Sequence, residues 1–158
     1  MNIIDYNSIY DADIKDLLVE LQIYIASIDK EKYNIVGDKY GDIEFEEVFK
    51  EITKNEGKML LAVENGIALG LIVGIIIPKE DSYSFKFPKR GKITELIVSK
   101  KCRSKGIGQR LLNKMNAHFK TLGCKGILIE VFAYNEMGKK FYYKNQYNDR
   151  SIVVYKKI

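Results

Sequence analysis

The sequence of 158 residues is poor in cysteine and histidine, and each shortage argues against a class of site. The two cysteines, Cys102 and Cys124, form no Cys-x-x-Cys pair, so neither a disulfide scaffold nor a zinc site is indicated. His118 is the only histidine, and we expect it to be structural or exposed, because no nucleophilic triad is needed. We therefore expect no metal centre and a protein that resides in a reducing cytoplasm.

Long hydrophobic runs are also absent. No apolar stretch reaches the roughly 18 to 20 residues that a membrane span requires. The acidic beginning, MNIIDYNSIYDADIK, lacks the basic-then-apolar layout of a secretory signal. Hydrophobic residues make up 46% and charged residues 30% of the chain, which is typical of a soluble globular protein. The length predicts a single domain over residues 1–158, and the lack of a long apolar run predicts no membrane partner.

The net charge of +5 raises the possibility of a nucleic-acid partner. The lysines are spread along the chain, however, and form no continuous block interleaved with aromatic residues. A basic surface that accepts a polyphosphate cofactor explains the charge at least as well. We expect no nucleic acid as the main partner, and keep a basic nucleic-acid-binding protein as an alternative that a steep salt dependence would favour.

The stretch from Thr94 to Leu112 carries the clearest functional pattern. A short apolar strand and a basic loop lead into Arg103-Ser104-Lys105-Gly106-Ile107-Gly108 and a helix. Glycine lets the backbone approach a ligand closely, and a helix N-terminus offers free amides and partial positive charge. This pattern indicates a phosphate or diphosphate site, although a plain strand-to-helix connection is the alternative. Neither Gly-x-x-x-x-Gly-Lys-Ser/Thr nor Gly-x-Gly-x-x-Gly occurs.

Apolar periodicity and turn residues predict a mixed α/β chain. The expected elements, in order, are a strand at Ile3–Tyr6, a helix capped by Asp11 or Asp13 and continuing to Ile28, a loop at 29–42, a helix at Ile43–Ile52, a hairpin of Lys58–Val63 and Ile67–Ile77, a loop at 78–90, a strand at Lys92–Val98, a helix at 106–122 ended by Gly123, a strand at 126–131, a helix at 135–144 and a last strand at 151–156. Within the hairpin, Gly70 and Gly74 indicate a bulge or a close backbone approach.

Leu96-x-Val98 followed by Arg103-x-x-Gly106-x-Gly108 resembles the acyl-CoA-binding motif of the GNAT superfamily of N-acetyltransferases. In that family the loop amides hold the CoA diphosphate, and the strand runs beside the pantetheine arm. The resemblance implies acetyl-CoA as co-substrate and a central, mostly antiparallel twisted sheet, splayed at the cofactor strand, with helices on both faces. It also implies cofactor contacts at Leu96, Ile97, Val98, Arg103, Ser104, Lys105, Gly106, Ile107, Gly108, Gln109, Asn135 and Tyr142.

A second segment, Asn135-Glu-Met-Gly138-Lys-Lys-Phe141-Tyr142 continuing to Tyr147, resembles the family's Asn-x-x-Ala-x-x-Phe-Tyr-x-x-x-Gly-Phe motif. Positions 135, 138 and 142 share one helix face, on which Asn135 can cap the helix or bond the cofactor's amides. Met137 and Phe141 lie on another face, which we expect to pack into the core. Gly138 stands in place of the usual Ala, and Gln146 in place of the usual Gly.

The resemblance implies that Tyr142 acts as general acid on the departing thiolate. An amine with a pKa near 10.4 must also lose a proton, which at pH 7 corresponds to roughly 4.6 kcal/mol. Glu95 and Glu130 are the candidate bases, and Glu130 resembles a residue of the ribosomal-protein N-terminal acetyltransferases. A salt-bridge or strand-edge role is the alternative for either glutamate. A backbone N–H near Val98 would stabilise the oxyanion of the tetrahedral intermediate.

The leading hypothesis is an acetyl-CoA-dependent N-acetyltransferase whose acceptor is a primary amine, on a small molecule such as a polyamine or aminoglycoside or on a protein or peptide. The loops at 29–42 and 78–90 would wall the acceptor pocket, and Asp38, Asp42 and Glu44 are compatible with a cationic acceptor. A module of the same fold that senses acyl-CoA without turnover is the alternative. A homodimer is left open.

Overall fold

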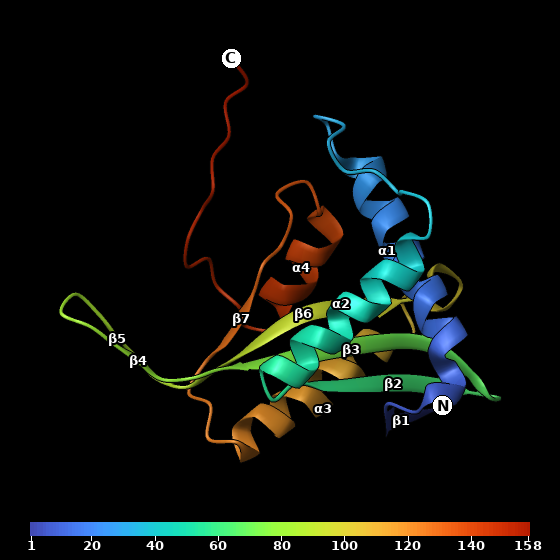
Figure 1. The fold of residues 1–158 in the computed structure, drawn as a ribbon, viewed down its shortest axis with the longest axis horizontal. Coiled ribbons are helices and arrows are strands. Elements are labelled where there is room, and N and C mark those ends of the chain that lie inside the picture. Colours follow the sequence, from blue (N-terminus) through green and yellow to red (C-terminus); the bar gives the residue numbers. More distant parts are fainter.

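The computed structural model describes residues 1–158, and its helices and strands occur in the order shown in Figure 1. The helices are α1 (Asp11–Ile28), α2 (Tyr40–Lys54), α3 (Ile107–Thr121) and α4 (Glu136–Lys144), with 3-10 turns at Ser8–Tyr10 and Lys100–Cys102. The strands are β1 (Asn2–Asp5), β2 (Lys58–Glu64), β3 (Ile67–Ile77), β4 (Glu80–Asp81), β5 (Lys86–Phe87), β6 (Arg90–Val98) and β7 (Ile127–Ile129). No helix combines the length and the apolar character needed to cross a membrane.

Five strands form one mixed sheet in the order β1-β2-β3-β6-β7. All neighbours are antiparallel except β6 and β7, which run parallel. This parallel ladder pairs only Gly91–Ile93 with Ile127–Ile129, so the edge of β6 that faces β7 is unpaired beyond Ile93. The mostly antiparallel sheet, splayed at the strand that carries Leu96 to Val98, confirms the fold expected from the sequence.

Helices cover both faces of the sheet (Figure 1). On one face, α3 buries Ile107, Leu111 and Met115 against apolar side chains of β2, β3 and β6. On the other face, α1 and α2 bury Ile14, Leu18 and Val48 against the same three strands. Alternate residues of the central strands therefore enter two separate cores, as expected for a nearly continuous apolar strand such as β3.

Two glycines let α3 approach the sheet closely. A Cβ atom at Gly74 would lie 2.5 Å from the Phe119 ring, and one at Gly91 would lie 2.6 Å from it. The register between β3 and β6 also shifts between Val73 and Gly74, which marks a bulge. Gly74 therefore lies at a bulge and also at a close approach to α3, which confirms the prediction at this position.

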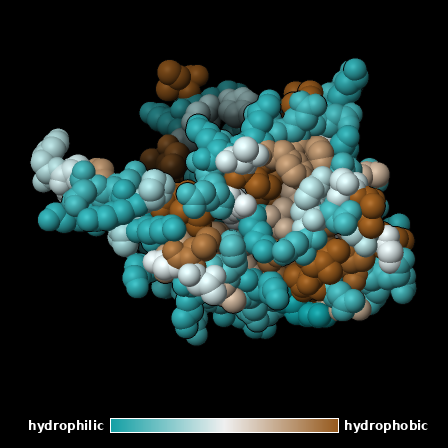
Figure 2. Space-filling model, turned by 60° about the horizontal axis from the view of Figure 1, so that its bottom comes forward, coloured by the Kyte–Doolittle hydropathy of each residue, from teal (hydrophilic) through white to brown (hydrophobic).

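Several element boundaries differ from the prediction. Helix α2 begins at Tyr40 rather than Ile43, directly after Lys39 in the left-handed conformation (φ 58°). The loop at 78–90 contains the short hairpin of β4 and β5, which projects from the body and is mostly hydrophilic in Figure 2. The strand expected at 126–131 is reduced to Ile127–Ile129 because β6 diverges from it.

The predicted cap of α1 is wrong, because Tyr10 is the N-cap residue and makes no side-chain cap. Asp11 instead accepts a hydrogen bond from the Tyr6 hydroxyl (2.8 Å), and Asp13 accepts one from the Ala68 amide (2.8 Å). These tertiary donors compete with the helix amides for the two carboxylates. The last predicted strand is also wrong: residues 151–156 pair with no strand and are exposed.

We predict that Gly74→Ala lowers the free energy of unfolding by about 1–3 kcal/mol, because the added methyl group overpacks the Phe119 contact. Chemical unfolding measures the change. Gly37→Ala is the control, since no atom lies within 4 Å of its Cβ position. Adding Phe119→Leu to Gly74→Ala should lessen the loss; an unchanged stability of Gly74→Ala would contradict the packing described.

Candidate active site

The turn between β6 and α3 presents free backbone donors. Ser104 and Gly106 both adopt positive φ (63° and 76°), and Gly106 is the N-cap residue of α3. The first backbone bond of the helix runs from the Arg110 amide to the Gly106 carbonyl (3.1 Å). The amides of residues 104–109 donate no backbone hydrogen bond within the protein. This run of amides at a helix N-terminus is suited to an anion.

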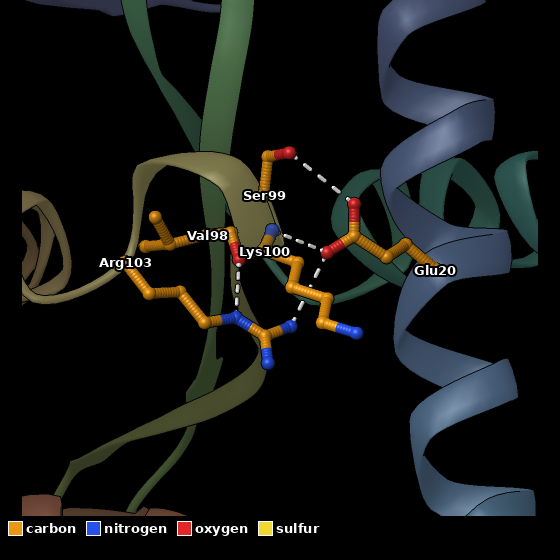
Figure 3. Close-up of polar contacts among 5 residues, drawn as sticks. All are labelled: Glu20, Val98, Ser99, Lys100 and Arg103. Atoms are coloured by element: carbon orange, nitrogen blue, oxygen red, sulfur yellow. Dashed lines mark hydrogen bonds and ion pairs between the residues drawn. The ribbon is translucent and has the colours of Figure 1, made fainter.

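Glu20 of α1 holds the beginning of this turn (Figure 3). Its carboxylate accepts hydrogen bonds from the Lys100 amide (2.5 Å) and the Ser99 hydroxyl (3.3 Å). The Arg103 guanidinium donates to it as well (3.3 Å) and also donates from Nε to the Val98 carbonyl (3.0 Å). A residue about 80 positions away in the sequence thus fixes both the backbone and the side chain of the turn.

Tyr24 lies one helical turn beyond Glu20 and contacts both sequence motifs. Its ring faces the Arg103 guanidinium (5.6 Å to the ring centroid), and its hydroxyl donates to Asn135 Oδ1 (3.1 Å). Asn135 caps α4 by accepting from the Gly138 amide (2.8 Å), which confirms its predicted capping role. A Cβ at Gly138 would lie 2.5 Å from the Asn135 amide nitrogen, which explains the glycine at this position.

Helices α3 and α4 are joined directly as well. Gln109 donates from Nε2 to Asn145 Oδ1 (2.5 Å), at the end of α4. Phe141 packs against the α3 core, as predicted, whereas Met137 is 50% exposed, so its predicted burial is wrong. Gln146 has φ 66°, so it occupies the left-handed position that glycine normally supplies after a helix.

Tyr142 is buried, with 9% of its surface exposed. Its ring makes edge contacts with Phe141 and Tyr147, with centroids 5.2 and 5.6 Å apart. Burial raises the pKa of the Tyr142 phenol well above its ordinary value, and the charges of Tyr147 and Glu95 add to the rise. The phenol therefore keeps its proton at neutral pH, and Glu95 lies within electrostatic range of it.

Glu95 lies on β6 opposite Val73, on the face that also bears the buried Ile97. Burial, and after it the charge of Glu44, raise the pKa of the Glu95 carboxyl to about 7. Tyr40 and Glu44 precede the buried Val48 by two turns and one turn of α2, so they share its face. Burial and both carboxylates raise the pKa of Tyr40 in turn, so Tyr40, Glu44 and Glu95 form one acidic cluster.

Glu130, the other predicted base, lies apart from this acidic cluster. It follows β7, its side chain is 85% exposed, and Lys92 pairs with it at 2.7 Å. Asp42, predicted near the acceptor, is paired with Lys15 (2.7 Å). The structure thus places Glu95 within electrostatic range of Tyr142 and leaves Glu130 at the surface.

Sequence reasoning missed Glu20, Tyr24 and Tyr40. Glu20 and Tyr24 contact residues more than 75 positions away, and no local spacing in the sequence predicts such contacts. The spacing of Tyr40, Glu44 and Val48 was a usable signal, because positions four apart share a helix face. The late start predicted for α2 concealed it.

Comparison with known proteins identifies the family. The model of the acetyltransferase (GNAT) family matches residues 23–147, which include the turn, Glu95 and Tyr142. The chain belongs to the GNAT family.

Relatives of this GNAT chain occur among curated proteins and solved structures. An uncharacterized N-acetyltransferase of Methanocaldococcus jannaschii is 35% identical over 85 residues, which are 53% of this chain and 51% of that protein. The match thus spans about half the length of that relative. The BH1408 protein of Bacillus halodurans, solved as a tetramutant, has a TM-score of 0.87 over 100% of both chains at 16% identity. A predicted acetyltransferase from Clostridium acetobutylicum, solved with acetyl-CoA, has a TM-score of 0.70 at 17% identity over 99% of this chain and 95% of that one.

We predict that Glu20→Gln loosens the turn between β6 and α3 and lowers the free energy of unfolding by about 1 kcal/mol. The change removes a carboxylate that accepts three hydrogen bonds. Glu47→Gln is the matched control, because its only ion pair, with Lys50, is exposed on α2. Urea unfolding measures both variants. Hydrogen exchange at residues 99–104 should increase for Glu20→Gln alone, and equal exchange in the two variants would contradict the role assigned to Glu20.

Proposed function

We propose that this protein is an acetyl-CoA-dependent N-acetyltransferase whose acceptor is a cationic primary amine. One observation supports this most: a half-buried glutamate with a pKa near 7 lies within electrostatic range of a buried, protonated tyrosine beside the splayed strand β6. A module that only senses acyl-CoA has no need for a carboxyl whose pKa matches the working pH.

The turn fits the diphosphate of coenzyme A. The free amides of residues 104–109 supply donors, and Lys100, Lys101 and Lys105 add positive charge around them. The GNAT relative from Clostridium that contains acetyl-CoA shares this fold. Beyond Ile93 the unpaired edge of β6 offers main-chain groups to the pantetheine arm. The Val98 carbonyl is the exception, because Arg103 already donates to it.

Acetyl-CoA supplies an activated acyl group as its thioester. The acceptor amine becomes nucleophilic only after it loses a proton, and Glu95 is the base that we assign to this step. A carboxyl with a pKa near 7 is about half ionised at neutral pH, whereas an ordinary glutamate is a much weaker base.

Tyr142 then protonates the departing thiolate. Its raised pKa keeps the phenol neutral, so the proton is present when the sulfur leaves. The hydrogen bond from Tyr24 to Asn135 holds α4 against α1, and the one from Gln109 to Asn145 holds α4 against α3. Helix α1 thus supports both Tyr142, through α4, and the turn between β6 and α3.

The acidic cluster also favours a cationic acceptor. Glu44 is half-buried beside Glu95 and forms no ion pair with a cation; its hydrogen-bond partner is the Tyr40 phenol. An ammonium group is attracted to this pair of carboxylates before Glu95 removes its proton. Polyamines and aminoglycosides carry such primary ammonium groups. An acceptor that is neutral or anionic near its amine would bind poorly.

The decisive experiment measures the release of free CoA thiol from acetyl-CoA in the presence of polyamines, aminoglycosides and lysine-containing peptides. We expect release that depends on both acetyl-CoA and a cationic amine, together with an acetylated product of matching mass. If the protein binds CoA but acetylates no amine of the panel, the sensing role replaces this proposal.

We predict that kcat/KM rises about tenfold per pH unit below pH 7 and levels off above it, because Glu95 must be ionised to act as base. Glu95→Gln should remove this rise and lower activity by roughly 10²–10⁴-fold. Glu44→Gln should move the midpoint to lower pH, since the Glu44 charge contributes to the raised pKa. If the pH profile of Glu95→Gln kept the same midpoint as that of the unaltered protein, Glu95 would be excluded as the base.

We predict that Tyr142→Phe lowers kcat by roughly 10²-fold or more while the Kd for CoA stays within twofold. The change removes only the hydroxyl from a buried ring, so packing is conserved. Tyr143→Phe is the matched control, because its hydroxyl bonds to Asp149 on the surface. Initial rates and CoA titration separate chemistry from binding; full activity in Tyr142→Phe would eliminate it as the acid.

A further inference from the structure

Residues 148–158, called the tail segment here, form the last part of the chain. They contain no helix or strand, and every one of them is exposed. In Figure 1 the tail segment runs past α4 to the end marked C. Lys156 and Lys157 lie near its end, and neither forms an ion pair. The tail segment therefore carries two unpaired primary amines outside the regular structure of the protein.

The tail segment begins beside the proposed general acid. Tyr147, the residue before it, donates from its backbone amide to the Tyr142 carbonyl (3.1 Å), and the two rings lie 5.6 Å apart. Lys156 follows nine positions after Tyr147, a length of chain that spans at most roughly 30 Å. A short flexible tether holds its end at an effective concentration on the order of 1 mM around its anchor. The two amines are thus concentrated near Tyr142 by the chain itself.

A tyrosine pair places the lysines beside the predicted acceptor loop. The Tyr155 hydroxyl lies 3.0 Å from the Tyr33 hydroxyl, and the rings make an edge contact at 6.1 Å. Tyr33 belongs to the loop at 29–42, which the sequence predicts to wall the acceptor pocket. Glu31 of this loop accepts a hydrogen bond from the Tyr134 hydroxyl (2.8 Å), directly before the cap of α4. The loop therefore contacts both the tail segment, next to its lysines, and the beginning of the helix that carries the proposed acid.

The tail segment is held less firmly than the loop. Apart from the tyrosine pair, the Arg150 guanidinium lies over the Phe87 ring (5.1 Å to the centroid). Water competes for such contacts at the surface, so they are weak. The loop also carries Lys32, but the buried Asp29 carboxylate accepts hydrogen bonds from three backbone amides around it. The tail lysines can therefore move into a site, whereas Lys32 lies in a fixed turn.

The charges of the tail segment and of the acidic cluster are complementary. Neither Glu44 nor Glu95 forms an ion pair with a cation. The tail segment contains Arg150 and the two lysines, against Asp149 as its one acidic side chain. A cationic amine is attracted to a pair of carboxylates, and this is the kind of acceptor inferred above from the cluster alone.

We propose that the protein acetylates its own tail segment, at Lys156 or Lys157, in an intramolecular reaction. The proposal rests on the proposed acetyl transfer and uses the same site. The C–S bond of the thioester breaks, and a C–N bond to the lysine Nζ forms. The ammonium group gives up two protons: Glu95 takes the first and releases it to water, and the second replaces the proton that Tyr142 gives to the sulfur. Acetylation removes the positive charge, so the modified tail segment leaves the acidic cluster to an external amine.

The test is to incubate the purified full chain with acetyl-CoA and no other amine, and to follow intact mass, peptide maps and CoA release. We expect the mass of one acetyl group for each modified lysine, located at Lys156 or Lys157. CoA release should stop once the tail segment is modified. Combining Lys156→Arg with Lys157→Arg should abolish both signals. Lys125→Arg, at an exposed lysine outside the tail segment, is the matched control and should leave them unchanged. Acetylation only at other lysines would overturn the proposal.

Two further measurements separate an intramolecular enzymatic reaction from the alternatives. Tyr142→Phe should slow acetylation of the tail segment by roughly 10²-fold or more, and an equal rate would indicate chemical acetylation and contradict the proposal. The rate per chain should stay constant over an about tenfold range of protein concentration, because the tether fixes the local concentration. In a mixture with Tyr142→Phe, intact mass distinguishes the chains, and only the unaltered one should be acetylated. Acetylation of the inactive chain would mean transfer between copies and overturn the proposal.

A polyamine assayed in parallel separates this proposal from the proposed function. If the polyamine is acetylated while the tail lysines are not, self-acetylation is wrong and the proposed function stands. If neither the tail segment nor any external amine is acetylated, the proposed function fails, and self-acetylation fails with it.

Discussion

The parting of β6 from β7 is the constraint on which the rest of this structure depends. The two strands share a ladder of only three residues and then diverge, which leaves the edge of β6 open where it carries Glu95 to Val98. A continuous ladder would fill this edge with another strand and bury the turn that follows. Free main-chain groups, a run of helix amides and the half-buried Glu95 carboxyl therefore lie on β6 and the turn that follows it.

An open edge needs support from elsewhere, and α1 provides it. Glu20 accepts hydrogen bonds from the turn between β6 and α3, and Tyr24 donates one to the cap of α4. Gln109 joins α3 to the end of α4. The two motifs are thus held at a fixed separation by side chains rather than by a β-ladder. Such support is directional, so the geometry of the turn and of Tyr142 is expected to be set before a cofactor binds.

Local patterns in the sequence were enough to predict the five strands of the main sheet, the glycine turn before α3 and helix α4. The hairpin at Asn65-Gly66, the glycine turn and the helix spacing from Asn135 to Tyr142 each depend on neighbouring residues. Contacts such as Glu20 with Lys100 join distant segments and leave no local pattern. The difference between Glu95 and Glu130 likewise depends on their exposure, which follows from tertiary packing and not from residue type. Residues 151–156 have the composition of a strand and were predicted as one, yet they pair with no strand of the chain.

The most direct test of this account is a crystal structure of the protein with coenzyme A. The account predicts the diphosphate on the amides of residues 104–109, the pantetheine arm along the unpaired edge of β6, and the sulfur within hydrogen-bond distance of the Tyr142 hydroxyl. A diphosphate bound elsewhere, or a sulfur remote from both Tyr142 and Glu95, would contradict it.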